Sequence, residues 1–429
     1  MNAKTCPIPH GSKARAKHSM RPAIDEVEVL RLRQEFPIFG NSPDVVFIDN
    51  AATAQKPERV LRRISRYYRH ECANAGRSAY RASTTTATAI EDCREKVATF
   101  LNTKVEQIAF TSGATDSLNT VALGWGLTNL KDGDEIMVCF EDHKSAVLPW
   151  LNLQSLLSRF GISIKIVPFD IHHEGDYELK SIRENVTAHT RLLAMTHIHH
   201  LYGLDMEVEQ IRDIVGQDVL ISLDVSQSIG HRKVDVSALP VDFVSFSGHK
   251  MFSGTGVGVL WTSARARHLM HAVKSGSTST GANSTSASHE PSLASIVESG
   301  TPNVAAVLSL APAIDFVERW TIERIEERIS DLTHYMRDAL STLEGVDFAP
   351  GFGRCGCPIG YGVISFRLEH IATSDLAFVL DAENIQVRTG NFCLSKRNQG
   401  DDYARVSLHV YNTKAEIDRF IEVLKGTLE

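Results

Sequence analysis

The stretch that decides the fold is residues 241–261, which reads VDFVSFSGHKMFSGTGVGVLW. Its two apolar segments, 241–244 and 257–261, are typical of buried strands. Between them, small and hydroxylated residues surround one lysine, Lys250, and such a composition fills a core poorly. A lysine desolvated at the mouth of a sheet has a lowered pKa, so that its neutral amine can attack a carbonyl group. Taken alone, Lys250 is better explained as a solvated loop lysine, because buried charges are rare.

The composition sets limits on the class of protein. The chain has 429 residues, of which 43% are hydrophobic and 23% charged, and its formal net charge is −7. This charge gives no electrostatic reason to expect nucleic acid or an anionic membrane as a partner. No apolar run approaches the roughly 18 residues of a membrane span. Seven scattered cysteines, without a recognisable secretory signal, favour a reducing cytoplasmic location.

The length favours two domains rather than one core. We predict a disordered basic tail over 1–24, where lysines and arginines occur without acidic residues. We assign 39–309 to a large domain, and 25–38 together with 310–429 to a small α+β domain.

Strand and helix patterns alternate through the large domain, which is the signature of a parallel sheet with crossover helices. The strands that we predict are 44–48, 107–111, 135–140, 163–168, 192–196, 219–223, 242–245 and 257–261. The helices that we predict are 25–36, ended by Pro37, then 57–72, 85–101, 115–127, 146–159, 178–185, 207–215, a long stretch over 303–343 and a last helix from Lys414. Segment 276–288 is rich in Ser, Thr and Gly, and we expect a loop or linker there. In such sheets, ligands bind at the carboxyl ends of the strands.

Polar clusters follow several of these strands. Residues 111–117, TSGATDS, precede a helix, where backbone N–H groups and hydroxyls can bind a phosphate, although ordinary helix caps look similar. His143 follows another strand and could stack on a planar ring, or could be a surface histidine. Asp224 and Gln227 lie at the end of the apolar strand 219–223. The carboxylate could hold a proton on a ring nitrogen, and the amide could donate to a ring oxygen. A turn would also use these residues.

The segment THIHH over 196–200 raises the possibility of a metal site, because imidazoles are common ligands. On a strand, His197 and His199 would share a face and His200 would point away. No carboxylate or cysteine lies at a short ligand spacing, so we expect no metal here.

A further cluster lies near the end of the chain. Cys393, in a glycine-containing loop, is a candidate thiolate nucleophile or an inert thiol. Arg388 and Arg405 flank it in sequence, and a guanidinium can bind a substrate carboxylate through two hydrogen bonds.

Together and in this order, the clusters resemble those of the class V aminotransferase family of pyridoxal-phosphate (PLP) enzymes, and among them the cysteine desulfurase and selenocysteine lyase group. The matching motifs are Asp224-x-x-Gln227, the SGHK of 247–250, the GTPN of 300–303 and the RTG-x-x-C of 388–393. The resemblance runs from about Asp49 to the end of the chain. It implies the PLP-dependent transferase fold of type I, with a seven-stranded, mostly parallel sheet and a smaller α+β domain.

The resemblance also implies roles for single residues. Lys250 would bind PLP covalently, Asp224 would pair with its ring nitrogen, His143 would stack on the ring and take part in catalysis, and Gln227 and His200 would face its phenolic oxygen. The phosphate would lie among Ala114, Thr115, Ser247 and His249, joined by Thr301 from the other subunit of a homodimer. Arg405, Arg388 and Arg77 would bind the substrate.

The implied reaction converts L-cysteine to L-alanine and leaves the sulfur as a persulfide on Cys393, from which a sulfur-acceptor protein would take it. Three departures from the family pattern surround the substrate. His200 replaces the usual asparagine, Asn391-Phe392 replaces the usual pair of histidines, and the loop that usually reads Asn-x-His-Arg-Gly is NAGRS over 74–78, in which Arg77 carries over. They leave open a PLP-dependent lyase, epimerase or aminotransferase acting on another amino acid. A non-enzymatic sulfur carrier of the same fold is a third hypothesis.

Overall fold

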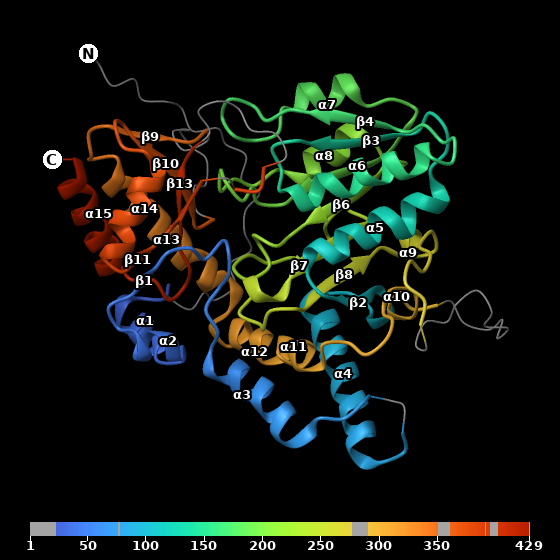
Figure 1. Ribbon diagram of the computed structural model, residues 1–429, viewed down its shortest axis with the longest axis horizontal. Coiled ribbons are helices and arrows are strands. Elements are labelled where there is room, and N and C mark those ends of the chain that lie inside the picture. The colour runs from blue at the N-terminus through green and yellow to red at the C-terminus, as the bar shows by residue number, and fades with distance from the viewer. Residues whose placement is uncertain are drawn as a thin grey trace.

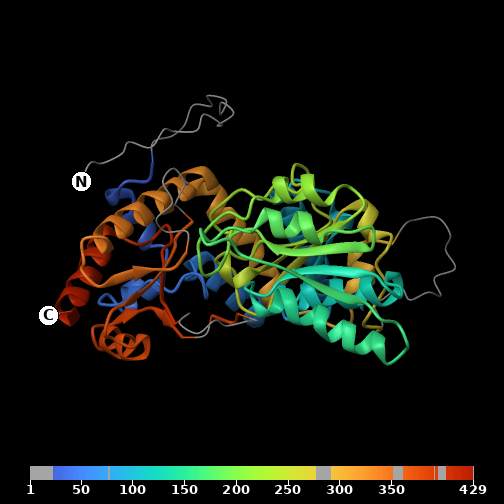
Figure 2. The ribbon, with the colours of Figure 1, turned by 90° about the horizontal axis from the view of Figure 1, so that it is seen from above.

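The structure is a computed structural model that describes residues 23–75, 78–276, 291–350, 361–390, 392–394 and 402–428. Three predictions fall outside these residues, wholly or in large part: the basic tail, the linker after Gly276, and the role of Arg77. Figure 1 shows two units side by side, one built around a large sheet and one that carries the C-terminal helix. Seen from above in Figure 2, the units again lie next to each other.

The large unit contains a seven-stranded sheet in the order β2-β8-β7-β6-β5-β3-β4. Its strands are β2 (Ile108–Thr111), β3 (Glu135–Cys139), β4 (Lys165–Phe169), β5 (Thr190–Thr196), β6 (Leu220–Asp224), β7 (Phe243–Ser247) and β8 (Gly258–Thr262). β8 pairs antiparallel with both of its neighbours, and the remaining pairs are parallel. The structure therefore confirms the predicted α/β class and the mostly parallel seven-stranded sheet.

Both faces of this sheet are buried along its central strands, and successive side chains of each strand pack on opposite sides. In β3, Met137 and Cys139 pack in one apolar cluster, whereas Ile136 and Val138 pack in another. The first cluster is closed by α4 (Arg81–Phe100), α7 (Leu179–Asn185), α8 (Val208–Val215) and α11 (Val304–Leu308). The second is closed by α5 (Ala114–Asn129), α6 (Lys144–Ser158) and α10 (Leu293–Val297). Helices on both faces are the expected cover of a parallel sheet.

The small unit contains a four-stranded antiparallel sheet in the order β12-β13-β10-β9. Its strands are β9 (Val346–Phe348), β10 (Val363–Leu368), β12 (Arg388–Thr389) and β13 (Ala404–Ser407). It packs against α13 (Ile322–Leu340), α14 (Thr373–Ala382) and α15 (Lys414–Leu428) through one apolar cluster. β1 (Val46–Phe47) pairs in parallel with β11 (Ile385–Gln386), so residues that we assigned to the large domain hydrogen-bond with the small unit. The domain boundaries stay a prediction.

Two predicted helices differ from the structure. α1 (Glu26–Arg33) ends before Pro37, and Pro37 opens α2 (Pro37–Asn41) instead of only ending a helix. Proline is tolerated at the first position of a helix, because that N–H has no partner within the helix. The stretch 303–343 forms α11, α12 (Leu310–Trp320) and α13, with a break at Thr321, whose φ is +60°.

The remaining helices are α3 (Glu58–Arg66), which continues as a π-helical turn over Tyr67–Glu71, and the short α9 (Ala264–Arg267). Within the described part of the chain, no helix combines the length and the apolar character needed to cross a membrane.

Candidate active site

A cavity of about 210 Å³ opens at the carboxyl ends of the parallel strands. Its lining includes most of the residues that the sequence singled out: Ala114, Thr115, His143, His200, Asp224, Gln227, Ser247, His249, Lys250, Arg388 and Arg405. Each of β2, β3, β5, β6 and β7 ends just before one of these groups. Parallel strands place their carboxyl ends on one edge, and this brings segments far apart in the sequence into one site.

Lys250 ends a short 3₁₀ turn, Gly248–Lys250, directly after β7. Burial lowers the pKa of its amino group to about 8, while the carboxylate of Asp224 acts in the opposite direction and Arg405 lowers the pKa further. A larger fraction of this amine is therefore neutral near pH 8 than in an exposed lysine, and the neutral amine is the form that attacks a carbonyl carbon.

One corner of the cavity is suited to an anion. α5 begins here after Gly113, an N-cap residue that has no side chain to cap the helix. The hydroxyl of Ser247 accepts a hydrogen bond from the backbone N–H of Ala114 at 2.8 Å, so the end of β7 and the start of α5 are joined. His249 lies beside them with Nδ1 3.2 Å from the hydroxyl of Thr53. Free N–H groups and the helix dipole favour negative charge at such a terminus.

Asp224 and Gln227 form another wall. The Asp224 side chain is buried, and its Oδ1 accepts the backbone N–H of Ser226 at 2.9 Å. Gln227 donates from Nε2 to the carbonyl oxygen of Ala51 at 2.9 Å. A buried carboxylate beside a lysine can hold a proton on a ring nitrogen of a bound ligand.

His143 is the N-cap residue of α6, and its Nδ1 accepts the backbone N–H of Ser145 at 3.3 Å. Its ring lies edge-on to that of His200, with centroids 5.4 Å apart. Burial, and then the charge of Lys250, lower the pKa of His143 to about 4, so the ring is neutral at physiological pH. A neutral, fixed imidazole at this position can stack on a planar ring.

Arg405 is almost fully buried, with 3% of its surface exposed. Its guanidinium donates from Nη1 to the carbonyl of His200 at 2.9 Å and from Nη2 to Oδ1 of Asp49 at 3.1 Å. Its Nε has no hydrogen-bond partner among the described residues. A buried charged donor without a partner is costly, so this atom marks a place for an acceptor from outside the protein.

Cys393 is half-buried and lies close to the cavity wall formed by Phe392. Its sulfur lies 3.9 Å from Nη2 of Arg388, and its carbonyl accepts the backbone N–H of Lys144 at 2.7 Å. Its φ of +60° is unusual for a residue with a side chain. The guanidinium is thus placed to attract negative charge on the sulfur.

The balance of charge in the cavity indicates its ligands. Lys250, Arg388 and Arg405 contribute positive charge, against the single lining carboxylate of Asp224. Asp49 offsets part of this by its pair with Arg405. The remaining excess, at two separate places, suits a ligand with a phosphate and a ligand with a carboxylate.

The three histidines of the THIHH segment have separate partners. His197 Nδ1 lies 2.9 Å from the hydroxyl of Ser228, His199 Nε2 lies 3.1 Å from the carbonyl of Glu141, and His200 Nε2 lies 2.9 Å from the carbonyl of Phe392. The segment follows β5 rather than continuing it, so the alternation that we expected of a strand does not apply.

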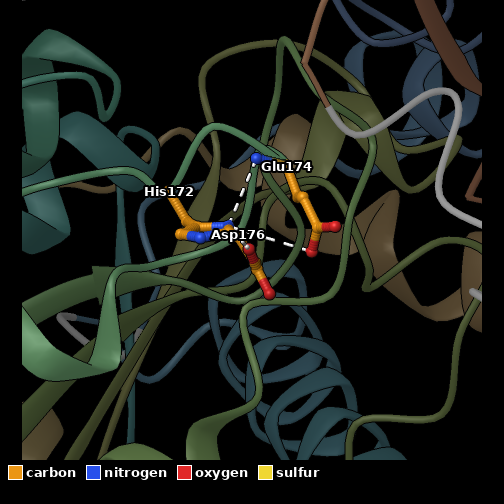
Figure 3. Close-up of side chains that lie close together, drawn as sticks. All are labelled: His172, Glu174 and Asp176. Atoms are coloured by element: carbon orange, nitrogen blue, oxygen red, sulfur yellow. Dashed lines mark hydrogen bonds and ion pairs between the residues drawn. The ribbon is translucent and has the colours of Figure 1, made fainter.

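A different histidine belongs to the group of possible metal ligands found among the described residues, His172, Glu174 and Asp176, on the loop after β4 (Figure 3). His172 Nδ1 lies 3.8 Å from Oε2 of Glu174 and 3.7 Å from Oδ1 of Asp176. That nitrogen also accepts the backbone N–H of Glu174 at 3.3 Å, which engages the lone pair that a metal would need. We therefore assign no metal to this partly exposed group.

Three predicted site residues are not among those that line the cavity. Cys393 lies next to the lining residue Phe392 but does not itself line the cavity. Thr301 lines a separate cavity of about 420 Å³, with Ser112 and Asp116 at the other side of the α5 N-terminus. Arg77 lies outside the described residues.

The sequence reasoning missed several residues of the site. Ala51, Ala52, Ser145, Thr196, Ser226 and Phe392 also line the cavity. The hydroxyl of Ser226 is buried without a hydrogen-bond partner among the described residues. Its place between Asp224 and Gln227 was a signal that could have identified it. Asp49 was missed because its partner, Arg405, lies far away in the sequence.

Comparisons with known proteins agree with the geometry. The family model for class V aminotransferases matches residues 46–420. A probable cysteine desulfurase of Halalkalibacterium halodurans is 32% identical over 406 residues, which cover 93% of this chain and 97% of that protein. A probable cysteine desulfurase of Staphylococcus aureus strain Mu50 is 33% identical over 423 residues, covering 96% of this chain and 98% of the relative.

Solved structures give the same result. The apo structure of a cysteine desulfurase from Thermococcus onnurineus NA1 superposes with a TM-score of 0.84 at 30% identity, covering 96% of this chain and 99% of that one. A cysteine desulfurase from Escherichia coli superposes with a TM-score of 0.79 at 26% identity, covering 93% and 98%. These likenesses confirm the fold class that the resemblance implied.

Proposed function

The chain belongs to the class V aminotransferase family, and we propose that it is a PLP-dependent cysteine desulfurase, which converts L-cysteine to L-alanine and transfers the sulfur to Cys393. The observation that carries the proposal is one cavity lined by Lys250 and Arg405, whose Nε is unsatisfied, with the sulfur of Cys393 3.9 Å from Nη2 of the lining residue Arg388. The first two groups suit a carbonyl cofactor and an amino-acid carboxylate, and the third suits a sulfur acceptor.

The residues present fit PLP. The N-terminus of α5, which begins after Gly113, supports a phosphate site together with Ser247 and His249, and Lys250 supplies the amine for the aldehyde. Asp224 is placed to hold the proton of the ring nitrogen, and His143 to pack on the ring. When bound, PLP withdraws electrons from the α-carbon of the substrate, which none of the side chains in this cavity can do.

Substrate binding follows from Arg405. Its Nη2 and Nη1 are occupied by Asp49 and by the carbonyl of His200, so the guanidinium is held in one orientation. Its Nε remains for a carboxylate oxygen, and a charge-assisted hydrogen bond in a buried site is a strong one. Arg388, half-buried in the same cavity, adds positive charge on the side of Cys393.

The chain's own residues then move protons and sulfur. Lys250, whose pKa is lowered to about 8 so that a substantial fraction of it is neutral at that pH, is placed to take the α-proton and to return a proton to the product. The Cys393 thiolate attacks the substrate sulfur, so that a sulfur–sulfur bond forms and the carbon–sulfur bond breaks. The electron pair of the broken bond stays with the substrate carbon, which gains a proton and becomes the methyl group of alanine. The carbon is reduced and the two sulfurs are oxidised, with no external oxidant.

The decisive experiment is mass spectrometry of the peptide that contains Cys393 after incubation of the PLP-loaded protein with L-cysteine. We expect added mass of one sulfur atom at Cys393 and stoichiometric alanine. Cys393→Ser should keep the yellow colour of bound PLP and lose alanine formation, whereas Cys72→Ser, at an exposed cysteine, should behave as the parent. Alanine formation that persists in Cys393→Ser would instead favour a lyase, epimerase or aminotransferase that does not use this thiol.

We also propose a homodimer. Thr301 lines the second cavity together with Ser112 and Asp116, near the start of α5. It does not line the active-site cavity of its own subunit, and this supports a contribution to the phosphate site of a partner subunit. In the dimer, Thr301→Ala should weaken PLP binding at the opposite subunit. Sedimentation of the parent, and PLP titration of hybrids that combine Thr301→Ala with Lys250→Ala subunits, test this arrangement. A sulfur-acceptor protein and a cytoplasmic location remain predictions.

A further inference from the structure

His200 stands on the cavity wall where it faces the segment that carries Cys393. We propose that His200 is a positioning residue, whose N–H holds the backbone beside Cys393 instead of binding the cofactor. Its Nε2 lies 2.9 Å from the carbonyl oxygen of Phe392, the residue before Cys393. The proposal rests on the proposed function only in treating Cys393 as the thiol that receives sulfur.

The hydrogen bond determines which nitrogen carries the proton. A carbonyl oxygen can only accept, so Nε2 of His200 must be the donor. Burial keeps the pKa of His200 well below its ordinary value, so the ring is neutral and Nδ1 is unprotonated. The single N–H of this imidazole is therefore committed to Phe392. It cannot also donate to the phenolic oxygen of PLP, which was the role that the resemblance implied for this position.

Other contacts hold the same segment from a second side. The backbone N–H of Lys144 donates to the carbonyl of Cys393 at 2.7 Å, and Leu394 forms an isolated bridge with His143. Phe392 is buried, and its ring centroid lies 5.3 Å from Cζ of Arg405. The carbonyl of Phe392 thus accepts a hydrogen bond from His200, and the carbonyl of Cys393 accepts one from Lys144, so two different segments hold the backbone around Cys393.

The geometry of Cys393 explains why such a restraint is needed. With φ at +60°, Cys393 has a backbone conformation that is unfavourable for a residue with a Cβ. A segment without restraint would relax toward negative φ, and this rotation would carry the sulfur away from Arg388, now 3.9 Å distant. The hydrogen bond from His200 to the carbonyl of Phe392 holds the residue next to Cys393 and so opposes this rotation.

The test measures the position of the thiol without using catalysis. Cys393 is alkylated by iodoacetamide in PLP-loaded protein without substrate, and its rate is followed by peptide mass spectrometry, with exposed Cys72 as the internal reference. We expect His200→Ala to change the rate at Cys393 by about five- to tenfold, as the loss of one hydrogen bond of ordinary net strength predicts, and to leave Cys72 unchanged. His200→Gln, whose longer amide side chain can donate to the same carbonyl, should restore most of the parental rate.

Two results would overturn the proposal. An unchanged Cys393 rate in folded His200→Ala would show that the hydrogen bond does not hold the thiol. A loss of PLP affinity with an unchanged rate of Cys393 alkylation would show that His200 binds the cofactor instead. If His200→Ala does not fold, His200→Asn gives the same comparison, since its amide is too short to reach Phe392 and should behave unlike His200→Gln. The alkylation assay is informative whether or not the protein desulfurates cysteine, so its outcome is separable from that of the proposed function.

Discussion

Oδ1 of Asp49 lies 3.1 Å from Nη2 of Arg405, which joins the segment after the first strand to the last strand of the chain. Burial raises the pKa of Asp49, and Arg405 opposes that effect; burial lowers the pKa of Arg405 to about 10, and Asp49 opposes it. The pair therefore favours the charged guanidinium and holds it in one orientation, while its buried Nε has no hydrogen-bond partner among the described residues.

Loss of this guanidinium should damage substrate binding more than cofactor binding. We expect Arg405→Met to lower kcat/KM for L-cysteine about 10- to 100-fold, the range for the loss of a charge-assisted hydrogen bond, with a raised KM and an unchanged PLP spectrum. Arg367→Met, on neighbouring β10 and paired with Asp347 at the surface, is the matched control and should keep parental kinetics. Parental KM in Arg405→Met would exclude Arg405 as the carboxylate ligand.

Gly258 should be needed for the phosphate corner. A Cβ at this position would lie 2.5 Å from Cα of Gly113, immediately before α5, and 2.8 Å from the carbonyl oxygen of Phe246. We expect Gly258→Ala to push the α5 N-terminus away from Ser247, to weaken PLP binding at least about tenfold and to cost about 1–3 kcal/mol of stability. PLP titration and thermal unfolding measure both effects. Gly426→Ala, with open space around it, should leave PLP affinity unchanged.

The pKa of Lys250 predicts how PLP loading depends on pH. The rate at which apo-protein captures PLP should rise about tenfold per pH unit below the pKa and level off above about 8, because only the neutral amine reacts. Capture is measured by borohydride trapping and mass spectrometry of the Lys250 peptide. Arg388 lowers this pKa, so Arg388→Met should move the plateau to higher pH. A rate that continues to rise toward the ordinary lysine pKa would contradict the desolvated amine.

Buried His197 should destabilise the protein in acid. Burial lowers its pKa from 6.5 to about 4, so between these values the unfolded chain binds a proton that the native protein does not. The resulting cost is absent well above pH 6.5, grows as the pH falls, and is complete below about 4. From pH 7 to pH 5, the parent should lose about 2 kcal/mol more unfolding free energy than His197→Asn.

Urea unfolding of both proteins at the two pH values measures this difference. The comparison subtracts groups that both proteins share, such as buried Asp142, whose pKa is raised to about 8 and whose effect has the opposite sign. His189→Asn, at an exposed position, is the matched control and should show the parental pH dependence. Equal losses in the parent and in His197→Asn would mean that His197 is accessible to protons in the native state.

The regular elements could be predicted because the chain repeats a strong local signal. The continuous apolar runs of β3 and β6 lie within two residues of the predicted ranges, since strands buried on both faces contain few polar positions. The break at Thr321 was missed because its positive φ interrupts a helical pattern without a glycine or proline to mark it. The sequence predicts that Pro37 ends a helix. Its actual position, at the start of α2, depends on the turn that precedes it.

The site was predictable where a residue lies at or just after the end of a strand, as Asp224 does in β6 and Lys250 does after β7. It was not predictable where two distant segments meet. The proton donor of His200 could have faced either the cofactor or the Cys393 segment, and its place next to Phe392 depends on the packing of the small unit against the large sheet. Sequence patterns identify the residues that come after each strand, but they do not determine which walls of the cavity will face each other.

The bridge between Asp49 and Ser407 has a consequence for biosynthesis. Translation proceeds from the N-terminus, so α5, Asp224 and Lys250 leave the ribosome well before β13 is made. A nascent chain that ends before Ala404 contains Lys250 and Asp224 but lacks Arg405, the proposed ligand of the substrate carboxylate. If Arg405 has this role, we expect the chain to become able to bind the amino acid only when its last strand has been made and has paired with the segment after β1.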